Sequence, residues 1–232
     1  MDNEHFSNKD IDAIDGKVSD NYFIPVFQDV LKEIKTAKEI CDVGCGNGLF
    51  SLYLKDEIKD VNITGLDGSE YALELAKERG LTNTCKINDF CKDVLPVDSE
   101  KFDFVVCKDV FEHLLKPDFL VKQISHITKK DGYALIHVPN HFPIKGRLKL
   151  LFNNDIDPLG FFPDSKRWNF PHIRFFTRES LIELMSIEGF KVEKELSHHF
   201  VTWSKLFKYL PEDTINKNAD LLSSGITILF KK

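Results

Sequence analysis

The residues best suited to hold a nucleotide-like ligand stand in the segment 42–48, D-V-G-C-G-N-G. Gly44, Gly46 and Gly48 occupy every second position there, and a backbone without Cβ atoms can turn sharply and let a ligand come into contact. A short apolar run precedes these glycines and an apolar helical pattern follows them, which predicts a buried strand, a turn and the amide-rich start of a helix. We therefore expect a binding loop at this point.

A carboxylate further along the chain is placed to complete such a site. Asp67 follows the predicted strand 61–66 and comes about 20 residues after Gly44, the spacing typical of nucleotide sites in α/β proteins. A carboxylate at the carboxyl end of a strand can accept hydrogen bonds from both hydroxyls of a ribose. The alternative is that Asp67 only caps the helix that begins near Ser69, because Asp and Ser are both favoured there.

The pair Glu112-His113, which follows the apolar strand predicted at 101–107, is the best candidate for acid–base chemistry. Histidine has a pKa near 6.5, so it can take a proton from an attacking hydroxyl at neutral pH. His172 offers the same chemistry later in the chain. The alternative for Glu112-His113 is a structural turn that is held by hydrogen bonds and never touches a substrate.

Composition limits the class of protein. The 232 residues, 42% of them hydrophobic, can bury the core of one domain, and a net charge of −6 argues against a nucleic-acid partner. The five cysteines form no C-x-x-C pair and match no histidine spacing typical of zinc, so we expect reduced thiols and no metal site. No apolar run approaches the roughly 20 residues of a membrane span. The acidic N-terminus does not fit a signal peptide, so we expect a cytoplasmic protein.

The elements that must position these residues alternate along the chain. Strand-like and helix-like patterns follow one another, which predicts an α/β fold with a mainly parallel sheet flanked by helices. We expect a mobile tail at 1–20 and a single domain at 21–232. The segment 141–171 breaks the alternation and carries cationic and aromatic side chains, so we predict a lid over an acceptor pocket. The alternatives for this segment are a contact in a homodimer or a membrane-surface patch.

Three segments together resemble the class I S-adenosylmethionine-dependent methyltransferases, in the small-molecule branch that acts on quinones and sugars. The glycine loop has Asp42 two places before its first glycine, K-D-V-F-E-H-L at 108–114 is similar to the family's segment after the fourth strand, and H-I-R-F-F-T at 172–177 is similar to its segment after the insertion. The resemblance covers about residues 36–196. It implies a Rossmann-like sheet of seven strands in the order 3-2-1-4-5-7-6, with the last strand antiparallel and helices on both faces.

The resemblance also implies S-adenosylmethionine as the cofactor and S-adenosylhomocysteine as the product. Asp67 would hold the ribose hydroxyls, Asp89 would accept the adenine amino group, and Phe90 would supply an apolar face for the adenine. An ordinary turn after a strand is the alternative for Asp89. The full set of implied cofactor residues is Asp42, Gly44, Cys45, Gly46, Asp67, Gly68, Asp89, Phe90 and Lys108.

The implied reaction is methyl transfer to an oxygen of a small metabolite or sugar precursor, with His113 or His172 as the base. The cations of the predicted lid favour an anionic or polyhydroxylated acceptor. We expect Tyr22, Arg147 and Arg174 to bind this substrate. Plain packing is the alternative for Tyr22, which lies on a predicted amphipathic helix, and Arg174 either binds an anion through its planar guanidinium or pins the lid to the body of the domain.

Two other classes of protein share a glycine loop. A nicotinamide-dependent oxidoreductase is disfavoured because Leu49 stands where the dinucleotide pattern G-x-G-x-x-G requires its third glycine. A non-catalytic methyltransferase-like subunit would be marked by a decayed cofactor loop, whereas the loop of this chain is intact. The sequence thus favours an active methyltransferase over both.

Overall fold

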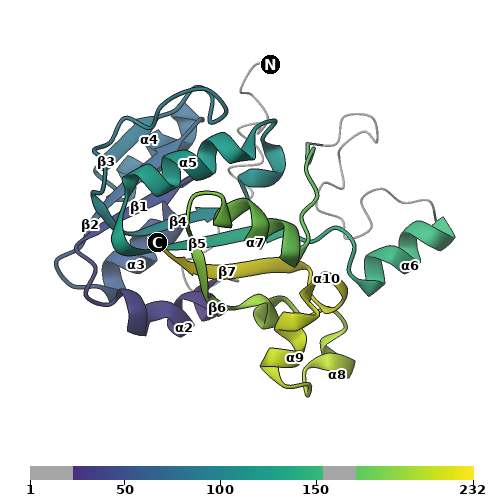
Figure 1. Ribbon diagram of the computed structural model, residues 1–232. Coiled ribbons are helices and arrows are strands. Elements are labelled where there is room, and N and C mark those ends of the chain that lie inside the picture. Colours follow the sequence, from purple (N-terminus) through teal and green to yellow (C-terminus); the bar gives the residue numbers. More distant parts are fainter. Residues whose placement is uncertain (1–22, 154–170) are drawn as a thin grey trace.

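The computed structural model describes residues 23–153 and 171–232 (Figure 1). They form a central sheet of seven strands with helices on both of its faces. The tail predicted at 1–20, Tyr22 and residues 154–170 of the predicted lid lie outside the described residues.

The sheet has the strand order β3-β2-β1-β4-β5-β7-β6, which confirms the order implied by the family resemblance. Neighbouring strands are parallel from β3 to β5, whereas β7 runs antiparallel to both β5 and β6. The strands are β1 Glu39–Val43, β2 Asn62–Asp67, β3 Asn83–Lys86, β4 Phe102–Lys108, β5 Thr128–Pro139, β6 Lys191–Glu195 and β7 Gly225–Lys231.

Strand β5 begins earlier than the sequence pattern indicates. The apolar run predicts a start near Tyr133, after a turn, but pairing begins at Thr128, opposite Phe102 of β4. The register then shifts between Phe102 and Phe104, and Asp131 takes a left-handed φ of 63°. The residues around Asp131, which look like a turn in the sequence, therefore belong to an irregular part of β5. The spacing of apolar residues does not reveal such an irregular part of a strand.

Helices α2 Ile24–Ile34, α3 Leu49–Glu57 and α4 Glu70–Glu78 cover one face of the sheet, and α5 Pro117–Ile127 and α7 Arg178–Ser186 cover the other (Figure 1). Helix α6 Ile144–Asn153 projects from one end of the molecule in the same view. The shorter elements are η2 Phe111–His113, η4 Ser197–Phe200, α8 Ser204–Phe207, α9 Glu212–Lys217 and α10 Ala219–Leu222.

Alternate residues of the central strands face two separate hydrophobic cores. In β4, Val105 and Cys107 belong to the core under α5 and α7, while Phe104 and Val106 belong to the core under α2 and α3. All four side chains are fully buried. Burial on both faces explains why the central strands have near-continuous apolar sequences. The five cysteines form no disulfide, in agreement with the expectation of reduced thiols.

The parallel strands β1, β2 and β4 end at one edge of the sheet, so the loops that follow them lie next to one another. In open α/β sheets, ligands bind in the crevice outside this carboxyl edge. Among residues 23–153 and 171–232, no helix has the length and apolar content needed to cross a membrane.

Candidate active site

The glycine loop connects β1 to α3 at the carboxyl edge of the sheet. Gly44, Gly46 and Gly48 have φ angles of 78°, 52° and 77°, a region that residues with side chains rarely adopt. A Cβ atom on Gly44 would clash with Val110 Cγ2, and one on Gly48 would lie 2.9 Å from a side chain of α4. A Cβ atom on Gly46 would meet nothing within 4 Å. Packing therefore requires Gly44 and Gly48, whereas Gly46 borders open space in which a ligand can approach the backbone.

Asp67 is the last residue of β2, and backbone amides hold both of its oxygens. Gly46 N donates to Oδ2 at 2.8 Å, and Ser69 N donates to Oδ1 at 2.8 Å. Burial raises the pKa of this carboxyl group, and the backbone amides of Ser69, Gly46 and Gly68 oppose that shift. Each oxygen keeps a lone pair for a further donor such as a ribose hydroxyl. The side-chain cap of α4 is Ser69, whose Oγ accepts from Ala72 N, so capping of α4 does not account for Asp67.

Two of the predicted cofactor residues have side chains that point into the protein. Asp42 is 3% exposed and accepts a 2.6 Å hydrogen bond from Ser51 Oγ, so it ties the end of β1 to α3. Burial raises the pKa of Asp42 to about 6. Cys45 is also buried, and its Sγ lies 2.8 Å from the point where a Cβ atom on Gly65 of β2 would be. Both side chains therefore hold the shape of the loop from within.

The loop after β3 lies beside the end of β2, because these two strands pair in parallel. Asp89 Oδ1 accepts from a backbone amide two residues later at 2.8 Å, and Oδ2 forms a 2.8 Å ion pair with Lys92, which lowers the pKa of Asp89. Phe90 is partly buried against the core under α5 and α7. Gly68 leads out of β2 beside this loop, with Ile87 O 3.4 Å from the position of a Cβ atom.

The loops after β1, β2 and β3 together fit an adenosyl cofactor that carries an amino-acid end. The order β3-β2-β1 places the polar turn at Asp89, the carboxylate of Asp67 and the open backbone at Gly46 in one row along the edge. The row offers an acceptor for an adenine amino group, two acceptors for ribose hydroxyls, and backbone amides at a helix start for a carboxylate.

The exit of β4 adds a charged pair to this edge. Lys108 Nζ lies 2.6 Å from Asp109 Oδ2 and 5.9 Å from the ring centroid of Phe23, just before α2. Asp109 Oδ1 lies 3.5 Å from Nε2 of the buried His137, whose pKa burial lowers to about 4. Asp109 also has a positive φ of 55°, and such strained residues gather at functional sites. Asp109 was not predicted as a site residue, because backbone strain is not visible in the sequence.

Four ionisable side chains gather just beyond β4 and β5. Glu112 and His113 lie on η2, His141 follows β5, and His172 lies in the segment that leads to α7. Glu112 Oε1 is 3.9 Å from His113 Nε2 and 3.9 Å from His172 Nε2. His141 Nε2 is 2.6 Å from His172 Nδ1. The structure therefore brings together His113 and His172, the two histidines predicted to be catalytic, and adds Glu112 and His141 to them. We call these four residues the histidine cluster.

Hydrogen bonds fix the orientation of His113 in this cluster. Its Nδ1 is 3.1 Å from Pro171 O. Because a carbonyl oxygen can only accept, Nδ1 carries the hydrogen, and Nε2 of the neutral ring holds the lone pair. The backbone amides of Ile173 and Arg174 donate to Glu112 O at 2.9 and 3.0 Å, which holds the segment of His172 against η2.

Electrostatics in the histidine cluster are set by burial. Glu112 has no exposed surface, and neither of its carboxylate oxygens has a hydrogen-bond partner among the described residues. Burial and the nearby charge of Asp109 raise the pKa of Glu112 well above its usual range. Burial, together with His113 and His141, lowers the pKa of His172 to about 3. Burial therefore favours the uncharged forms of both Glu112 and His172.

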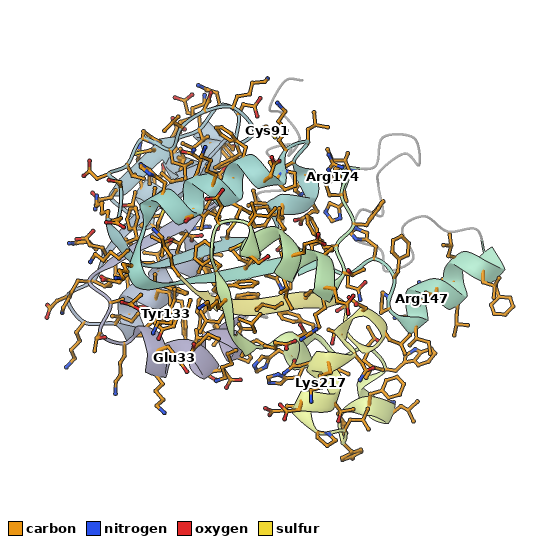
Figure 2. All side chains as sticks on the ribbon, viewed as in Figure 1. Glu33, Cys91, Tyr133, Arg147, Arg174 and Lys217 are labelled. Atoms are coloured by element: carbon orange, nitrogen blue, oxygen red, sulfur yellow. The ribbon has the colours of Figure 1, made fainter. Side chains whose placement is uncertain are left out.

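The two arginines predicted to bind substrate, Arg147 and Arg174, form hydrogen bonds with backbone carbonyls. Arg174 donates from Nε to Leu114 O at 3.3 Å and from Nη2 to Leu115 O at 2.5 Å, which corresponds to the alternative in which it pins one segment to another. Arg147 donates from Nε to Phe142 O at 2.7 Å. Figure 2 shows Arg147 on the projecting α6, well apart from Arg174. Arg147 is exposed, and its substrate role stays a prediction.

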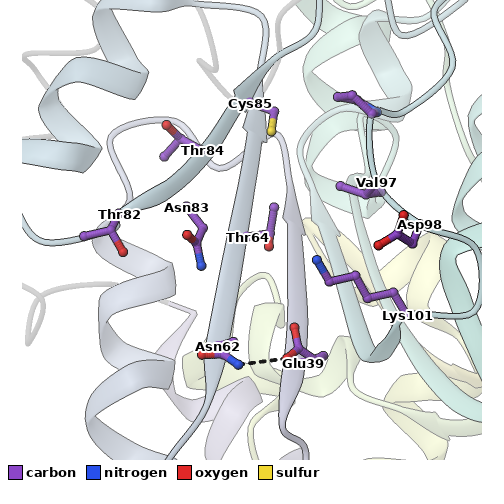
Figure 3. A pocket seen from close by; sticks show the side chains of 11 residues that line it. Glu39, Asn62, Thr64, Thr82, Asn83, Thr84, Cys85, Val97, Asp98 and Lys101 are labelled. Atoms are coloured by element: carbon purple, nitrogen blue, oxygen red, sulfur yellow. Dashed lines mark hydrogen bonds between the residues drawn. The ribbon is translucent and has the colours of Figure 1, made fainter.

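A polar groove of about 580 Å³ lies on a different part of the sheet (Figure 3). Its lining includes Glu39 and Asn62, the first residues of β1 and β2, which are joined by a 2.8 Å hydrogen bond, and residues along β3. None of the predicted site residues lines it. The groove lies at the amino ends of β1 and β2, opposite the edge where parallel sheets bind ligands. We therefore do not assign it to the active site.

The sheet order, the glycine loop and the amide-held carboxylate of Asp67 define a Rossmann-like, cofactor-binding α/β domain. A family model described as a methyltransferase domain matches residues 19–195. The chain therefore belongs to the methyltransferase domain family.

Known relatives agree with this family. The chain is 27% identical over 177 residues to a ubiquinone biosynthesis O-methyltransferase from Glaesserella parasuis, a match that covers 73% of this chain and 72% of the relative. A protein of the same name from Coxiella burnetii is 33% identical over 97 residues, or 41% of each chain. An S-adenosylmethionine dependent methyltransferase from Mesorhizobium loti has the same fold, with a TM-score of 0.62 at 15% identity, over 93% of this chain and 100% of that one.

The chain is thus a methyltransferase, and S-adenosylmethionine is its cofactor. The comparisons lend no support to the nicotinamide-dependent oxidoreductase that the sequence left as an alternative. The row along the carboxyl edge, from Asp89 through Asp67 to Gly46, is where we predict that the cofactor binds.

Proposed function

We propose that the chain transfers a methyl group to an oxygen nucleophile of a small metabolite or sugar precursor. The observation that carries this proposal is the histidine cluster beside the glycine loop, in which His113 is partly buried. Val110, two residues before Glu112, packs against Gly44, so the cluster and the cofactor loop are neighbours. The names of the two relatives, both O-methyltransferases, support an oxygen acceptor.

The bound cofactor supplies an electrophilic methyl group, and its transfer breaks the S–CH₃ bond and leaves S-adenosylhomocysteine. A hydroxyl acceptor must lose its proton as the O–CH₃ bond forms, and the chain must receive that proton. His113 is suited to this because the bond from Nδ1 to Pro171 O leaves the Nε2 lone pair as the proton acceptor. His172 is a weaker base, because its pKa lies at about 3. We therefore assign proton removal to His113.

The partners of the two arginines bear on the class of acceptor. Both guanidinium groups bind backbone carbonyls, which supports a neutral hydroxyl compound over an anionic one as the acceptor. The lid over 141–171, the homodimer formed through it and the cytoplasmic location stay predictions. The intact glycine loop gives no support to a non-catalytic subunit.

The test measures formation of S-adenosylhomocysteine with a panel of phenols, quinols and sugars, and with amines for comparison. His113→Gln should slow methyl transfer by about 100-fold or more, the usual contribution of a general base, while the Kd for S-adenosylmethionine changes by less than about twofold. His126→Gln is the matched control, because His126 is an exposed histidine on α5. Turnover with amines alone would contradict the oxygen acceptor, and wild-type turnover by His113→Gln would contradict its role as the base.

A further inference from the structure

We infer that Glu112, His113 and His172 form a binding site for a divalent transition-metal cation. The inference deepens the proposed function, and its catalytic meaning rests on that function. With the cation bound, His113 Nε2 would be a metal ligand and not the base, and the cation would take over the activation of the acceptor hydroxyl. It departs from the expectation drawn from the sequence, which predicted no metal because the cysteine pattern has no zinc spacing.

The geometry of three candidate ligand atoms supports the site. Glu112 Oε1, His113 Nε2 and His172 Nε2 lie within 4.8 Å of one another, and Oε1 is 3.9 Å from each nitrogen. Separations of this size are too long for hydrogen bonds. Zinc holds nitrogen and oxygen ligands at about 2.0–2.2 Å. A cation between the three atoms therefore requires each side chain to move by only a few tenths of an ångström.

The carboxylate of Glu112 provides an independent observation. It has no exposed surface, and both of its oxygens are without a hydrogen-bond partner among the described residues. A buried polar group that lacks a partner destabilises the fold, and buried charges in proteins are paired or coordinate a metal. A cation bound to Glu112 removes this cost, which no described side chain does.

In His113 and His172, the ring nitrogen that would not bind the metal, Nδ1, has the kind of partner that metal-bound histidines need. Such histidines turn their second N–H to a carbonyl, a carboxylate or another acceptor, which orients the ring and directs the remaining lone pair at the metal. His113 Nδ1 donates to Pro171 O at 3.1 Å. His172 Nδ1 lies 2.6 Å from His141 Nε2, which can accept its hydrogen. Both rings are thus held with Nε2 turned toward Glu112.

The ligand set selects the kind of metal. Two imidazoles and one carboxylate suit Zn²⁺ and related transition metals, whereas Mg²⁺ and Ca²⁺ prefer ligands that are all oxygen. Three protein ligands leave a position open for an exchangeable oxygen, as in catalytic zinc sites. An acceptor hydroxyl bound there would release its proton to solvent, and the resulting oxygen anion would form the O–CH₃ bond as the S–CH₃ bond breaks.

A second group of ligand-type side chains serves as the internal control. Among the described residues, Asp29, His198 and His199 also lie close enough to hold a metal. There, however, Asp29 Oδ2 is already 2.9 Å from His199 Nε2, and His198 Nδ1 faces the amide nitrogen of Asn216 at 3.3 Å. Because the amide N–H of Asn216 donates to Nδ1, the hydrogen of the neutral His198 ring lies on Nε2. A metal at this group of residues would need the lone pair of that Nε2 atom.

The experiment uses the full chain after dialysis against a chelator. Zn²⁺ binding is measured by calorimetry and by metal content after gel filtration, and Co²⁺ is added as a spectroscopic probe whose visible bands report nitrogen and oxygen ligation. The wild type and His199→Ala should each bind one ion. Glu112→Gln and His172→Gln should each weaken Zn²⁺ binding by about 100-fold or more. Loss of a residue that only hydrogen-bonds to a metal ligand typically weakens binding by about 10- to 100-fold, so loss of a ligand itself should cost at least as much. Mg²⁺ should not compete.

Circular dichroism and S-adenosylmethionine binding check that each variant is folded, and His172→Gln tests the site separately should Glu112→Gln fail to fold. The inference is overturned if the wild type binds no Zn²⁺, if either variant of the site keeps wild-type affinity, or if His199→Ala loses the ion. Methyl transfer by metal-free protein would leave the proposed function intact and His113 as the base. If the protein binds Zn²⁺ but transfers no methyl group to any acceptor, the proposed function is refuted and the metal site still stands.

Discussion

The carboxylate of Asp67 is expected to provide much of the affinity for S-adenosylmethionine, and Asp67→Ala tests this directly. The carboxylate stands at the end of β2, with Oδ2 held by Gly46 N and Oδ1 held by Ser69 N, each at 2.8 Å. The substitution removes two acceptors for the ribose hydroxyls and also the bond that links β2 to the glycine loop. It leaves the strand itself in place, because β2 pairs with β1 and β3 through its backbone.

The expected loss of affinity follows from these bonds. A hydrogen bond to a charged group contributes about 1.5–3 kcal/mol, so the loss of two such bonds, partly replaced by water, should cost about 3 kcal/mol of binding free energy. Since about 1.4 kcal/mol corresponds to a factor of ten, the Kd should rise by roughly 100-fold.

Calorimetric titration with S-adenosylmethionine, S-adenosylhomocysteine and NAD measures this change. Glu70→Ala is the matched control, because Glu70 lies on the neighbouring α4, has the same charge, and is 71% exposed in its pair with Lys86. It should bind S-adenosylmethionine as the wild type does. If Asp67→Ala binds within about threefold of the wild type, or if NAD binds the wild type more tightly than S-adenosylmethionine, the assignment of the carboxyl edge is refuted.

Two further predictions concern stability. Gly44→Ala should lower the free energy of unfolding in urea by about 2–3 kcal/mol, because the new Cβ clashes with Val110 at a φ of 78°, whereas Gly46→Ala, which borders open space, should lower it by about 1 kcal/mol. Equal losses would contradict the packing argument. Burial raises the pKa of Asp42 from 3.8 to about 6 in the folded state, so its contribution to stability is present below pH 4 and is lost as the pH rises through 6. Asp42→Asn keeps an acceptor for Ser51 Oγ without the charge, so its unfolding free energy relative to the wild type should rise by about 2–3 kcal/mol between pH 4 and pH 7.5. A difference that is independent of pH would contradict this.

Much of the fold could be predicted from the sequence, because the signals are local. The apolar run before Gly44 and the helical pattern after it define a strand, a turn and a helix within one short stretch, and the structure has β1 and α3 there. The order of the strands came from the resemblance of a few motifs to a known family, and the structure confirms it. The start of β5 was missed, because its first residues form an irregular stretch in which Asp131 has a left-handed backbone.

The amino-acid sequence by itself determined the fold class, since the strand and helix patterns behind it are local in the chain. The row of cofactor residues was predicted from motifs of the same local kind, and it stays a prediction. Only the tertiary structure decided how Glu112, His141 and His172 meet, because these residues come from three segments that long-range packing brings together. It also decided the partners of Arg174, which binds the carbonyls of Leu114 and Leu115. Side-chain contacts across such separations depend on the packed backbone of both segments, and no local pattern of residues encodes them.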